Sequence, residues 1–304
     1  MRFRACLKNH FRDLQAPLCG IFCPYSVDVA LLRRPHSGEI SHKLELAAHK
    51  KPFSNTLYSA NVCFMGEIKM EQEYNVAIVL AAGKGSRMHT RVQKQYIQIG
   101  GHPLLYYSLK QFELSDEISE IVLVTGAGEI DYCQKEIAEK YGLKKVKKIV
   151  AGGAERYLSV YEGLKVCHGD YVLIHDGARP FVDGNMIART LAAARKDGAC
   201  VAAMPVKDTI KVSDQDGYAD RTPERSSLWM VQTPQTFGYR LIREAYDRLI
   251  EEGITGVTDD AMVLERMNGR KVKLAEGSYQ NIKVTTPEDI LIAEAFLNAG
   301  KYSN

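Results

Sequence analysis

From Val76 onward, short runs of apolar and mostly β-branched residues alternate with longer amphipathic stretches, and this alternation constrains the fold more than any other feature. Continuous apolar runs predict strands that are buried on both faces, and the stretches between them predict helices that cover a parallel sheet. The sequence therefore predicts an α/β fold, a Rossmann-like and mostly parallel sheet with helices on both faces. The expected strands are Val76–Leu80, Ile121–Val124, Lys147–Val150, Tyr171–Ile174 and Cys200–Pro205.

Helices are expected between and after these strands. The clearest start is Thr286-Pro287-Glu288-Asp289, which supplies an N-cap, a proline in the first turn and acids at the positive end of the helix dipole. A protruding β-hairpin arm is expected at about 206–228, a polar stretch that contains Asp216-Gly217. The expected helices are Leu104–Phe112, Glu129–Tyr141, Arg156–Lys165, Asn185–Lys196, Tyr239–Glu251, Thr258–Met267 and Pro287–Asn298.

Residues 1–69 have no sustained helical or strand period, and we predict that they form a poorly structured extension outside a domain of residues 70–304. Three interpretations remain open for this segment. A secretory signal would need an uninterrupted apolar stretch, but Pro17 and Pro24 interrupt the best one; a plastid transit peptide fits the composition only loosely. The pattern favours a third interpretation, in which translation begins at Met65 or Met70, directly before the first strand.

Charge and cysteine content exclude several classes of protein. Residues 1–69 hold 10 Lys and Arg against 5 Asp and Glu, so the remaining residues hold 30 against 32 and are close to neutral. We therefore expect no nucleic-acid partner. The chain has no run of 18 apolar residues, so no membrane partner is expected. The scattered Cys133, Cys167 and Cys200 are typical of a reducing compartment, which predicts a cytoplasmic protein, or a plastid one only if residues 1–69 are a transit peptide.

A glycine-rich loop follows the first strand. Ala81, Ala82, Gly83 and Gly85 let backbone N–H groups approach an anion closely. The loop is no P-loop, and position 88 lacks the third glycine of a dinucleotide-binding fingerprint, which disfavours a NAD-dependent dehydrogenase. Arg87 and Lys94 add two cations, and this combination suits a triphosphate.

Together with the motifs that follow, the loop resembles the 2-C-methyl-D-erythritol 4-phosphate cytidylyltransferase family of the non-mevalonate isoprenoid pathway. The resemblance covers about residues 74–298 and preserves the family's order. Its motifs are Ala81-Ala-Gly-x-Gly-x-Arg-Met, Lys94-Gln95-Tyr96, Gly152-Gly153-x-Glu155-Arg156-x-x-Ser159-Val160, His175-Asp176-Gly177-Ala178-Arg179-Pro180, Asp208-Thr209, Thr233-Pro234-Gln235, Thr258-Asp259 and Asn281-Ile282-Lys283-Val284-Thr285.

The resemblance implies a nucleotidyltransferase-type fold and an enzyme that uses CTP, methylerythritol phosphate and Mg²⁺. The expected catalytic residues are Arg87, Lys94, Arg225 and Lys283. The apolar neighbours of Lys283 predict a short strand there, and the resemblance implies that the Lys283 side chain contacts the sugar phosphate. Asp176 would bind the nucleotide and a Mg²⁺ ion, because a carboxylate at the carboxyl end of a strand suits either role. The remaining expected nucleotide-binding residues are Ala81, Ala82, Gly83, Gly85, Gly153, Ser159 and Ala178, and the expected substrate-binding residues are Thr209, Arg179, Thr233 and Thr258.

The resemblance also implies a homodimer in which the arm at 206–228 carries Thr209 and Arg225 into the partner's site. Two alternatives stay open. A ribitol-5-phosphate cytidylyltransferase shares the nucleotide motifs, although its loop tends to read Ala-Gly-Gly where this chain has Ala81-Ala82-Gly83. A noncatalytic nucleotide-binding protein on the same fold should have lost some of the site's charged residues, and this chain retains Arg87, Lys94, Asp176 and Lys283.

Overall fold

A computed structural model of the chain describes residues 73–83 and 93–300. The extension expected at 1–69, and Gly85 and Arg87 of the glycine-rich loop, lie outside the described residues. Within them, none of the helices has the length and apolar character needed to span a bilayer. Cys133, Cys167 and Cys200 are buried free thiols.

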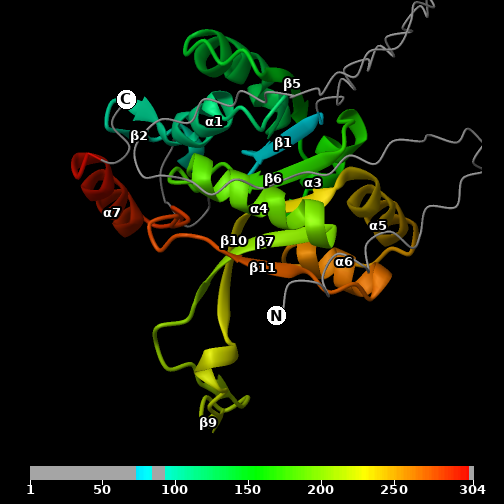
Figure 1. Cartoon of the computed structure of the whole chain (residues 1–304). Helices are drawn as coiled ribbons and strands as arrows, with labels where there is room; N and C mark the ends of the chain where they lie inside the picture. Colours follow the sequence, from blue (N-terminus) through cyan, green and yellow to red (C-terminus); the bar gives the residue numbers. More distant parts are fainter. Residues whose placement is uncertain (1–72, 84–92, 301–304) are drawn as a thin grey trace, which may run out of the picture. The chain divides into compact units, whose positions relative to one another are not determined.

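A seven-stranded sheet, in the order β11-β7-β10-β6-β1-β4-β5, forms the centre of the described part (Figure 1). β1 pairs in parallel with β4 and β6, β4 pairs in parallel with β5, and β7 pairs in parallel with β11. All five expected strands are present, which confirms the predicted α/β class. The strands are β1 (Asn75–Leu80), β4 (Glu120–Thr125), β5 (Val146–Ala151), β6 (Tyr171–Asp176), β7 (Ala199–Pro205), β10 (Trp229–Gly238) and β11 (Lys273–Glu276).

Two strands of this sheet were not predicted. β10 runs antiparallel to both β6 and β7, with a register shift between Val231 and Gln235. Its inner half buries Gln232, Thr233, Gln235 and Thr236, so it lacks the apolar run by which the other strands were recognised. β11 is an edge strand of mostly exposed residues. Both strands are defined by their neighbours rather than by local hydrophobicity.

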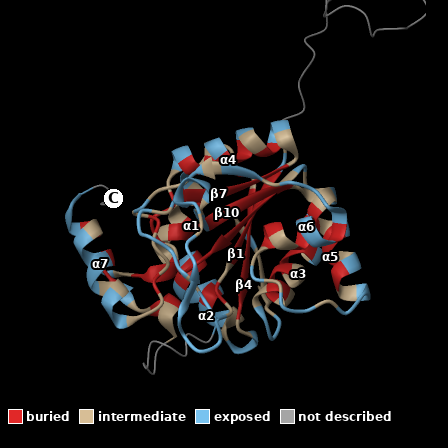
Figure 2. Cartoon of the chain, turned by 90° about the horizontal axis from the view of Figure 1, so that it is seen from below, coloured by how far each residue is buried: buried red, intermediate tan, exposed pale blue. Residues whose placement is uncertain are grey.

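Helices cover both faces of the sheet, and the side chains of β1 alternate between the two layers. Val76 and Ile78 pack with α3, α5 and α6, whereas Ala77 and Val79 pack with α1 and α4. Figure 2 shows the strands as a buried layer with helices around it whose outer sides are exposed. These helices are α1 (Leu104–Leu114), α3 (Arg156–Val166), α4 (Gly184–Asp197), α5 (Tyr239–Glu251) and α6 (Asp260–Asn268).

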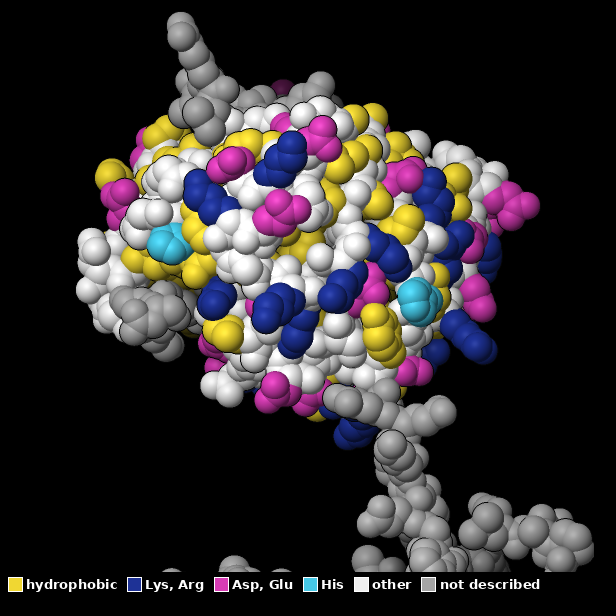
Figure 3. All heavy atoms as spheres, turned by 90° about the horizontal axis from the view of Figure 1, so that it is seen from above, with side chains coloured by type: hydrophobic (Ala, Val, Ile, Leu, Met, Phe, Trp, Pro, Cys, Tyr) yellow, Lys and Arg dark blue, Asp and Glu magenta, His cyan; other side chains and the backbone are white. Residues whose placement is uncertain are grey.

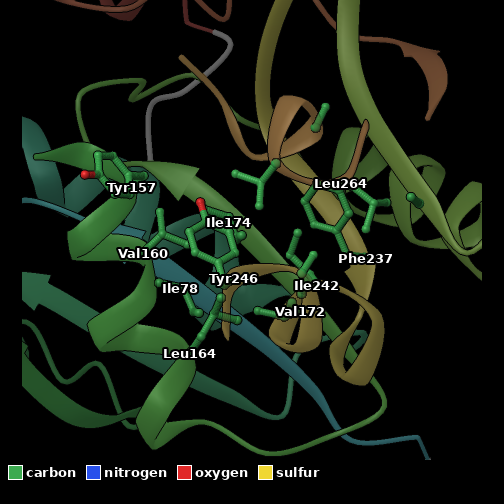
Figure 4. Close-up of a cluster of buried hydrophobic side chains, with 14 of the residues drawn as sticks. Ile78, Tyr157, Val160, Leu164, Val172, Ile174, Phe237, Ile242, Tyr246 and Leu264 are labelled. Atoms are coloured by element: carbon green, nitrogen blue, oxygen red, sulfur yellow. The ribbon is translucent and has the colours of Figure 1, made fainter. Parts of the chain in front are cut away.

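The larger hydrophobic cluster lies between β1, β6 and β10 on one side and α3, α5 and α6 on the other (Figure 4). Tyr246 of α5 is fully buried at its centre beside Ile78 and Val160. Burying one such side chain contributes roughly 1.5–3 kcal/mol, so this cluster holds the helical layer firmly against the sheet. The face drawn in Figure 3 carries side chains of both signs, with Lys and Arg gathered toward its middle.

α7 (Pro287–Asn298) packs as a separate element on a third cluster that includes Phe181 and Val284. Its start is the predicted one: Pro287 opens the helix and the Asp289 carboxylate accepts from the Thr286 backbone N–H at 2.9 Å. Three short elements of the described residues precede α1, and Ile99 of one of them belongs to the same third cluster. They are η2 (Lys94–Tyr96), β2 (Gln98–Ile99) and β3 (His102–Pro103).

Two expected helices are present with local differences, and one expected strand is absent. The helix expected at about Glu129–Tyr141 is mostly π-helical: η3 (Ala127–Glu129) is followed by one α-turn, α2 (Ile130–Tyr132), and a π-helical stretch, η4 (Cys133–Glu139). The helix expected from Thr258 begins at Asp260, because the Asp259 carboxylate caps it by accepting from the Met262 N–H at 3.0 Å. Lys283 lies in an irregular extended segment and not in a strand.

The predicted arm is present as a hairpin excursion between β7 and β10. It contains a two-stranded sheet, β8 (Val212–Ser213) with β9 (Ala219–Arg221), and then η5 (Arg225–Ser227). Figure 1 shows it extending away from the body of the domain. Almost all of its side chains are exposed, so the arm buries little apolar surface within its own chain.

Candidate active site

A cavity of about 470 Å³ opens at the carboxyl ends of β1 and β6 and beside the start of α3. Ligands of open α/β sheets bind at this edge. Seven of the eight expected nucleotide-binding residues line the cavity, and the eighth, Gly85, lies outside the described residues. The seven are Ala81, Ala82, Gly83, Gly153, Ser159, Asp176 and Ala178; Lys94 and Lys283 line the same cavity.

One wall of this cavity depends on glycine. A Cβ on Gly152 would lie 2.5 Å from the Ala82 Cβ and 2.7 Å from the Ser159 hydroxyl oxygen, closer than real Cβ contacts. The loop after β1 therefore packs directly against the loop after β5. Ala82 and Ser159, the two residues that Gly152 allows to approach, both line the cavity.

Four charged side chains meet beside the cavity. Arg156 donates two hydrogen bonds of 2.9 Å to the Asp260 carboxylate, and its Nε donates to Asp176 Oδ1 at 3.0 Å. The Lys283 Nζ lies 2.7 Å from the other oxygen, Asp176 Oδ2. The Tyr246 hydroxyl also donates to Asp260, at 2.6 Å. Two buried carboxylates and two part-exposed cations thus compensate each other.

The electrostatics of this group fix its protonation states. Burial opposes ionisation of Asp176, but Arg156, Lys283 and Arg179 together hold its pKa well below the usual range. Burial likewise opposes the charge of Arg156, but Asp260 and Asp176 raise its pKa well above the ordinary value. Asp176 is therefore an anion and Arg156 a cation at neutral pH.

A second cavity, of about 480 Å³, adjoins the first. Arg156, Asp176 and Lys283 line both cavities, so the charged group forms the boundary between them. Three of the four expected substrate-binding residues, Arg179, Thr233 and Thr258, line the second cavity. The Arg179 Nη1 donates to the Asn281 carbonyl at 2.8 Å, whereas its buried Nε has no hydrogen-bond partner among the described residues.

The turn after β6 is held by His175. A carbonyl can only accept, so the His175 Nε2, which is 3.0 Å from the Arg179 carbonyl, carries the proton. The unprotonated Nδ1 then accepts from the Thr233 hydroxyl at 3.0 Å, and that hydroxyl accepts from the Asp176 N–H at 3.1 Å. The Thr233 hydroxyl is thus occupied in holding this turn. Any contact of Thr233 with a ligand in the second cavity must therefore come from its other atoms.

Lys283 is positioned by its neighbours in the chain. The Asn281 side chain, fully buried, donates to the Thr233 carbonyl at 2.8 Å, and the Val284 N–H donates to the Ala178 carbonyl at 2.8 Å. These bonds fasten the segment on both sides of Lys283 to β10 and to the turn after β6. The strand expected at Lys283 is absent.

The sequence analysis missed two residues of this group. Arg156 stands in a quoted motif but received no role, and Asp260 was placed inside a helix; they are 104 residues apart and meet only through folding. The two remaining site predictions lie elsewhere: Thr209 and Arg225 are exposed on the arm and line neither cavity. The Arg225 Nη1 donates to the Lys207 carbonyl at 3.1 Å within the arm.

Comparison with known proteins places this geometry in one family. The family model for 2-C-methyl-D-erythritol 4-phosphate cytidylyltransferase matches residues 75–299, and a model for a family of unknown function matches residues 7–33. A protein of that cytidylyltransferase name from Lachnospira eligens is 52% identical over 225 residues, which cover 73% of this chain and 99% of the relative. One from Alkaliphilus oremlandii is 51% identical over 222 residues, covering 72% and 93%.

Solved structures agree. A crystal structure of 4-diphosphocytidyl-2C-methyl-D-erythritol synthase from Anaerococcus prevotii is 39% identical, with a TM-score of 0.67 over 75% of this chain and 97% of that one. The 2-C-methyl-D-erythritol 4-phosphate cytidylyltransferase of Thermus thermophilus is 32% identical, with a TM-score of 0.60 over 73% and 98%. Together with the family model, which matches residues 75–299, these matches show that the chain belongs to the 2-C-methyl-D-erythritol 4-phosphate cytidylyltransferase family.

Proposed function

We propose that the protein transfers the cytidylyl group of CTP to 2-C-methyl-D-erythritol 4-phosphate, giving 4-diphosphocytidyl-2-C-methyl-D-erythritol and pyrophosphate for isoprenoid precursor synthesis. The observation that carries the proposal is the pair of adjoining cavities that share Arg156, Asp176 and Lys283. One cavity is bounded by the small residues after β1, as a nucleotide requires. The other is lined by Arg179, whose positive charge suits an anionic group.

The reaction joins two anions. An oxygen of the sugar phosphate attacks the α-phosphorus of CTP, the new P–O bond forms, and the bond to the pyrophosphate oxygen breaks. A phosphate monoester is already mostly dianionic near pH 7, because its second pKa is about 6, so no general base is needed. The protein must instead align the reactants and neutralise their charge.

The cations divide between the two reactants. Lys94 lines the first cavity, and we assign it and Arg87 to the triphosphate and to the negative charge that develops on it. Lys283, at the boundary, is assigned to the attacking phosphate, with Arg225 supplied by a second subunit. Because Lys283 is bonded to Asp176, a phosphate that arrives beside it must compete with that carboxylate for the ammonium group.

The site fits a Mg²⁺ ion held mainly by substrate. The described residues contain no group of three or more His, Cys, Asp or Glu side chains that could enclose a metal. Mg²⁺ in nucleotide enzymes is commonly bound by one or two carboxylates together with phosphate oxygens. Asp176 offers one ionised carboxylate at the cavity wall, where the ion would neutralise charge on the triphosphate.

A homodimer formed through the 206–228 arm completes the proposal. Large apolar side chains are exposed along the arm and at its base. Such a cluster of exposed apolar side chains is typical of a protein–protein interface. Arg225 and Thr209 lie among them, outside both cavities of their own chain. The exposed apolar residues are Ile210, Tyr218, Trp229, Met230 and Val231, between 37% and 74% accessible.

Complementation tests whether Arg225 acts across the dimer. We expect Arg225→Ala and Lys94→Ala each to be nearly inactive alone. After the two variants are unfolded and refolded together, about half the dimers should be mixed, and each mixed dimer has one site with neither substitution. Recovery to about a quarter of wild-type turnover is expected. No recovery, with mixed dimers present by mass spectrometry, would exclude a contribution from the partner.

Pyrophosphate release tests the overall assignment. The purified full chain is incubated with each of the four ribonucleoside triphosphates, paired with either methylerythritol phosphate or ribitol 5-phosphate. Rapid release only with CTP and methylerythritol phosphate is expected. Faster turnover of ribitol 5-phosphate would favour the sister enzyme, and nucleotide binding without release would favour a noncatalytic binding protein. We propose further that residues 70–304 are the catalytic domain and that the enzyme works in the cytoplasm.

A further inference from the structure

Gln95 and Tyr96 follow Lys94 in the same turn, and the proposed chemistry gives neither of them a role. Gln95 lines the first cavity, and its side-chain amide donates to the Ala81 carbonyl at 2.6 Å. Tyr96 is 9% exposed and lines neither cavity, so its hydroxyl does not reach a substrate there. The ring instead points to the end of β4, where it meets a cluster of polar atoms.

That cluster is organised around one carboxylate. Oε2 of Glu129 accepts from the Tyr96 hydroxyl at 2.9 Å, from the Thr125 hydroxyl at 3.0 Å and from the Gly126 N–H at 3.3 Å. The Cys133 thiol lies 3.1 Å from the Tyr96 hydroxyl oxygen and can donate to it. Every proton in the cluster therefore has an acceptor, and the tyrosine ring has a single favourable position.

The same end of β4 also holds the cavity wall. The Thr125 carbonyl accepts from the Gly152 N–H at 2.8 Å, and the Val124 carbonyl accepts from the Ala81 N–H at 2.6 Å. Thr125 thus joins the glycine wall through its backbone and the Lys94–Tyr96 turn through its side chain. A shift of this strand end would move both parts of the first cavity.

We propose that Tyr96 and Glu129 are a positioning pair that fixes the Lys94 ammonium group where the triphosphate reacts. The inference rests on the proposed function and adds to it two residues that touch no reactant. Only one residue separates Tyr96 from Lys94 in the chain, so a tyrosine that can slide lets the lysine backbone slide with it. A displacement near 1 Å can lower a rate about 10²-fold, and a partly loosened turn loses less.

Tyr96→Phe and Glu129→Gln test the pair in the full chain. Each should lower kcat about tenfold while KM for CTP changes less than about twofold, as expected when the affected group acts in the transition state. Tyr74→Phe is the matched control. The Tyr74 hydroxyl donates to Glu120 at 2.7 Å, the same chemistry at the opposite end of β4, and this variant should keep wild-type kcat.

A double-mutant cycle separates positioning from general damage to the fold. In a Lys94→Ala background, Tyr96→Phe should change the residual kcat less than about twofold, because the group it positions is already absent. An undiminished tenfold loss in that background would overturn the proposal, as would wild-type kcat in both Tyr96→Phe and Glu129→Gln. If the unmodified protein released no pyrophosphate from CTP, the proposed function itself would fail. Failure of the positioning pair alone would instead appear as wild-type kcat in the variants of an active enzyme.

Discussion

Acid should destabilise the protein through His175, and the structure gives the size of the effect. Burial lowers the pKa of His175 from 6.5 to about 4. Its two ring nitrogens are satisfied only in the neutral form, by the Arg179 carbonyl and the Thr233 hydroxyl. Protonating Nδ1 would set a donor against that hydroxyl, and the hydroxyl proton would then have no acceptor in the chain of bonds described above.

Between pH 6.5 and about 4 the unfolded chain binds a proton at this histidine that the folded chain excludes. The free energy of unfolding therefore falls as the pH falls through this window. With 1.36 kcal/mol for each pKa unit, His175 alone removes about 2 kcal/mol by pH 5 and about 3 kcal/mol by pH 4. Above pH 7 the histidine is neutral in both states and contributes no pH dependence.

His175→Gln isolates this contribution. A glutamine amide can donate to the Arg179 carbonyl and accept from Thr233 but does not titrate. Urea unfolding at pH 7.5, 5 and 4 gives the free energy of unfolding for both proteins. Other groups, including His102, whose pKa burial also lowers, are common to both and cancel in the difference. Equal losses of stability between pH 7.5 and 4 would refute the reasoning.

The site and the domain boundary give three further predictions. Lys94→Ala should lower pyrophosphate release 10²–10³-fold without changing the melting temperature, as for the loss of one preorganised donor, and near-normal turnover would exclude its role. Asp260→Ala should lower the free energy of unfolding by about 3 kcal/mol, because it removes a fully buried carboxylate that accepts hydrogen bonds from Arg156 and Tyr246. Asp247→Ala, which removes an exposed helical partner of Arg243, should cost less than about 1 kcal/mol, and similar losses for both would contradict this account. A chain that begins at Met70 should retain wild-type kcat, and a tenfold lower value would show that residues 1–69 serve catalysis.

Much of the fold was predictable because its signals are local. Strands β1, β4 and β6 are short, continuous apolar runs, a pattern typical of buried strands, and each appears where expected. The Thr286–Asp289 start of α7 is likewise encoded within four residues. The seven described residues expected to bind the nucleotide line one cavity, and their role in nucleotide binding stays a prediction.

Prediction failed where an element's stability comes from distant partners. β10 buries two glutamine side chains, Gln232 and Gln235, which donate to the distant Ser278 carbonyl and Asp259 carboxylate. The mainly π-helical hydrogen bonding of the helix expected at Glu129–Tyr141 was not predicted, nor was the contact of distant Tyr96 with Glu129 at its start. The two residues of each contact lie far apart in the chain, so the hydrophobic periodicity of a local segment cannot predict these contacts.

The parallel sheet, the glycine loop and the identity of most charged groups could be read from the chain alone, because each depends on residues close together in it. Only the tertiary structure shows that Arg156 bridges Asp260 and Asp176 and that Lys283 also contacts the Asp176 carboxylate. A buried charge is tolerated only beside its compensating partner, and nothing in the local sequence says which distant residue that partner is. The fold brings these side chains to one boundary, and that boundary joins the two cavities.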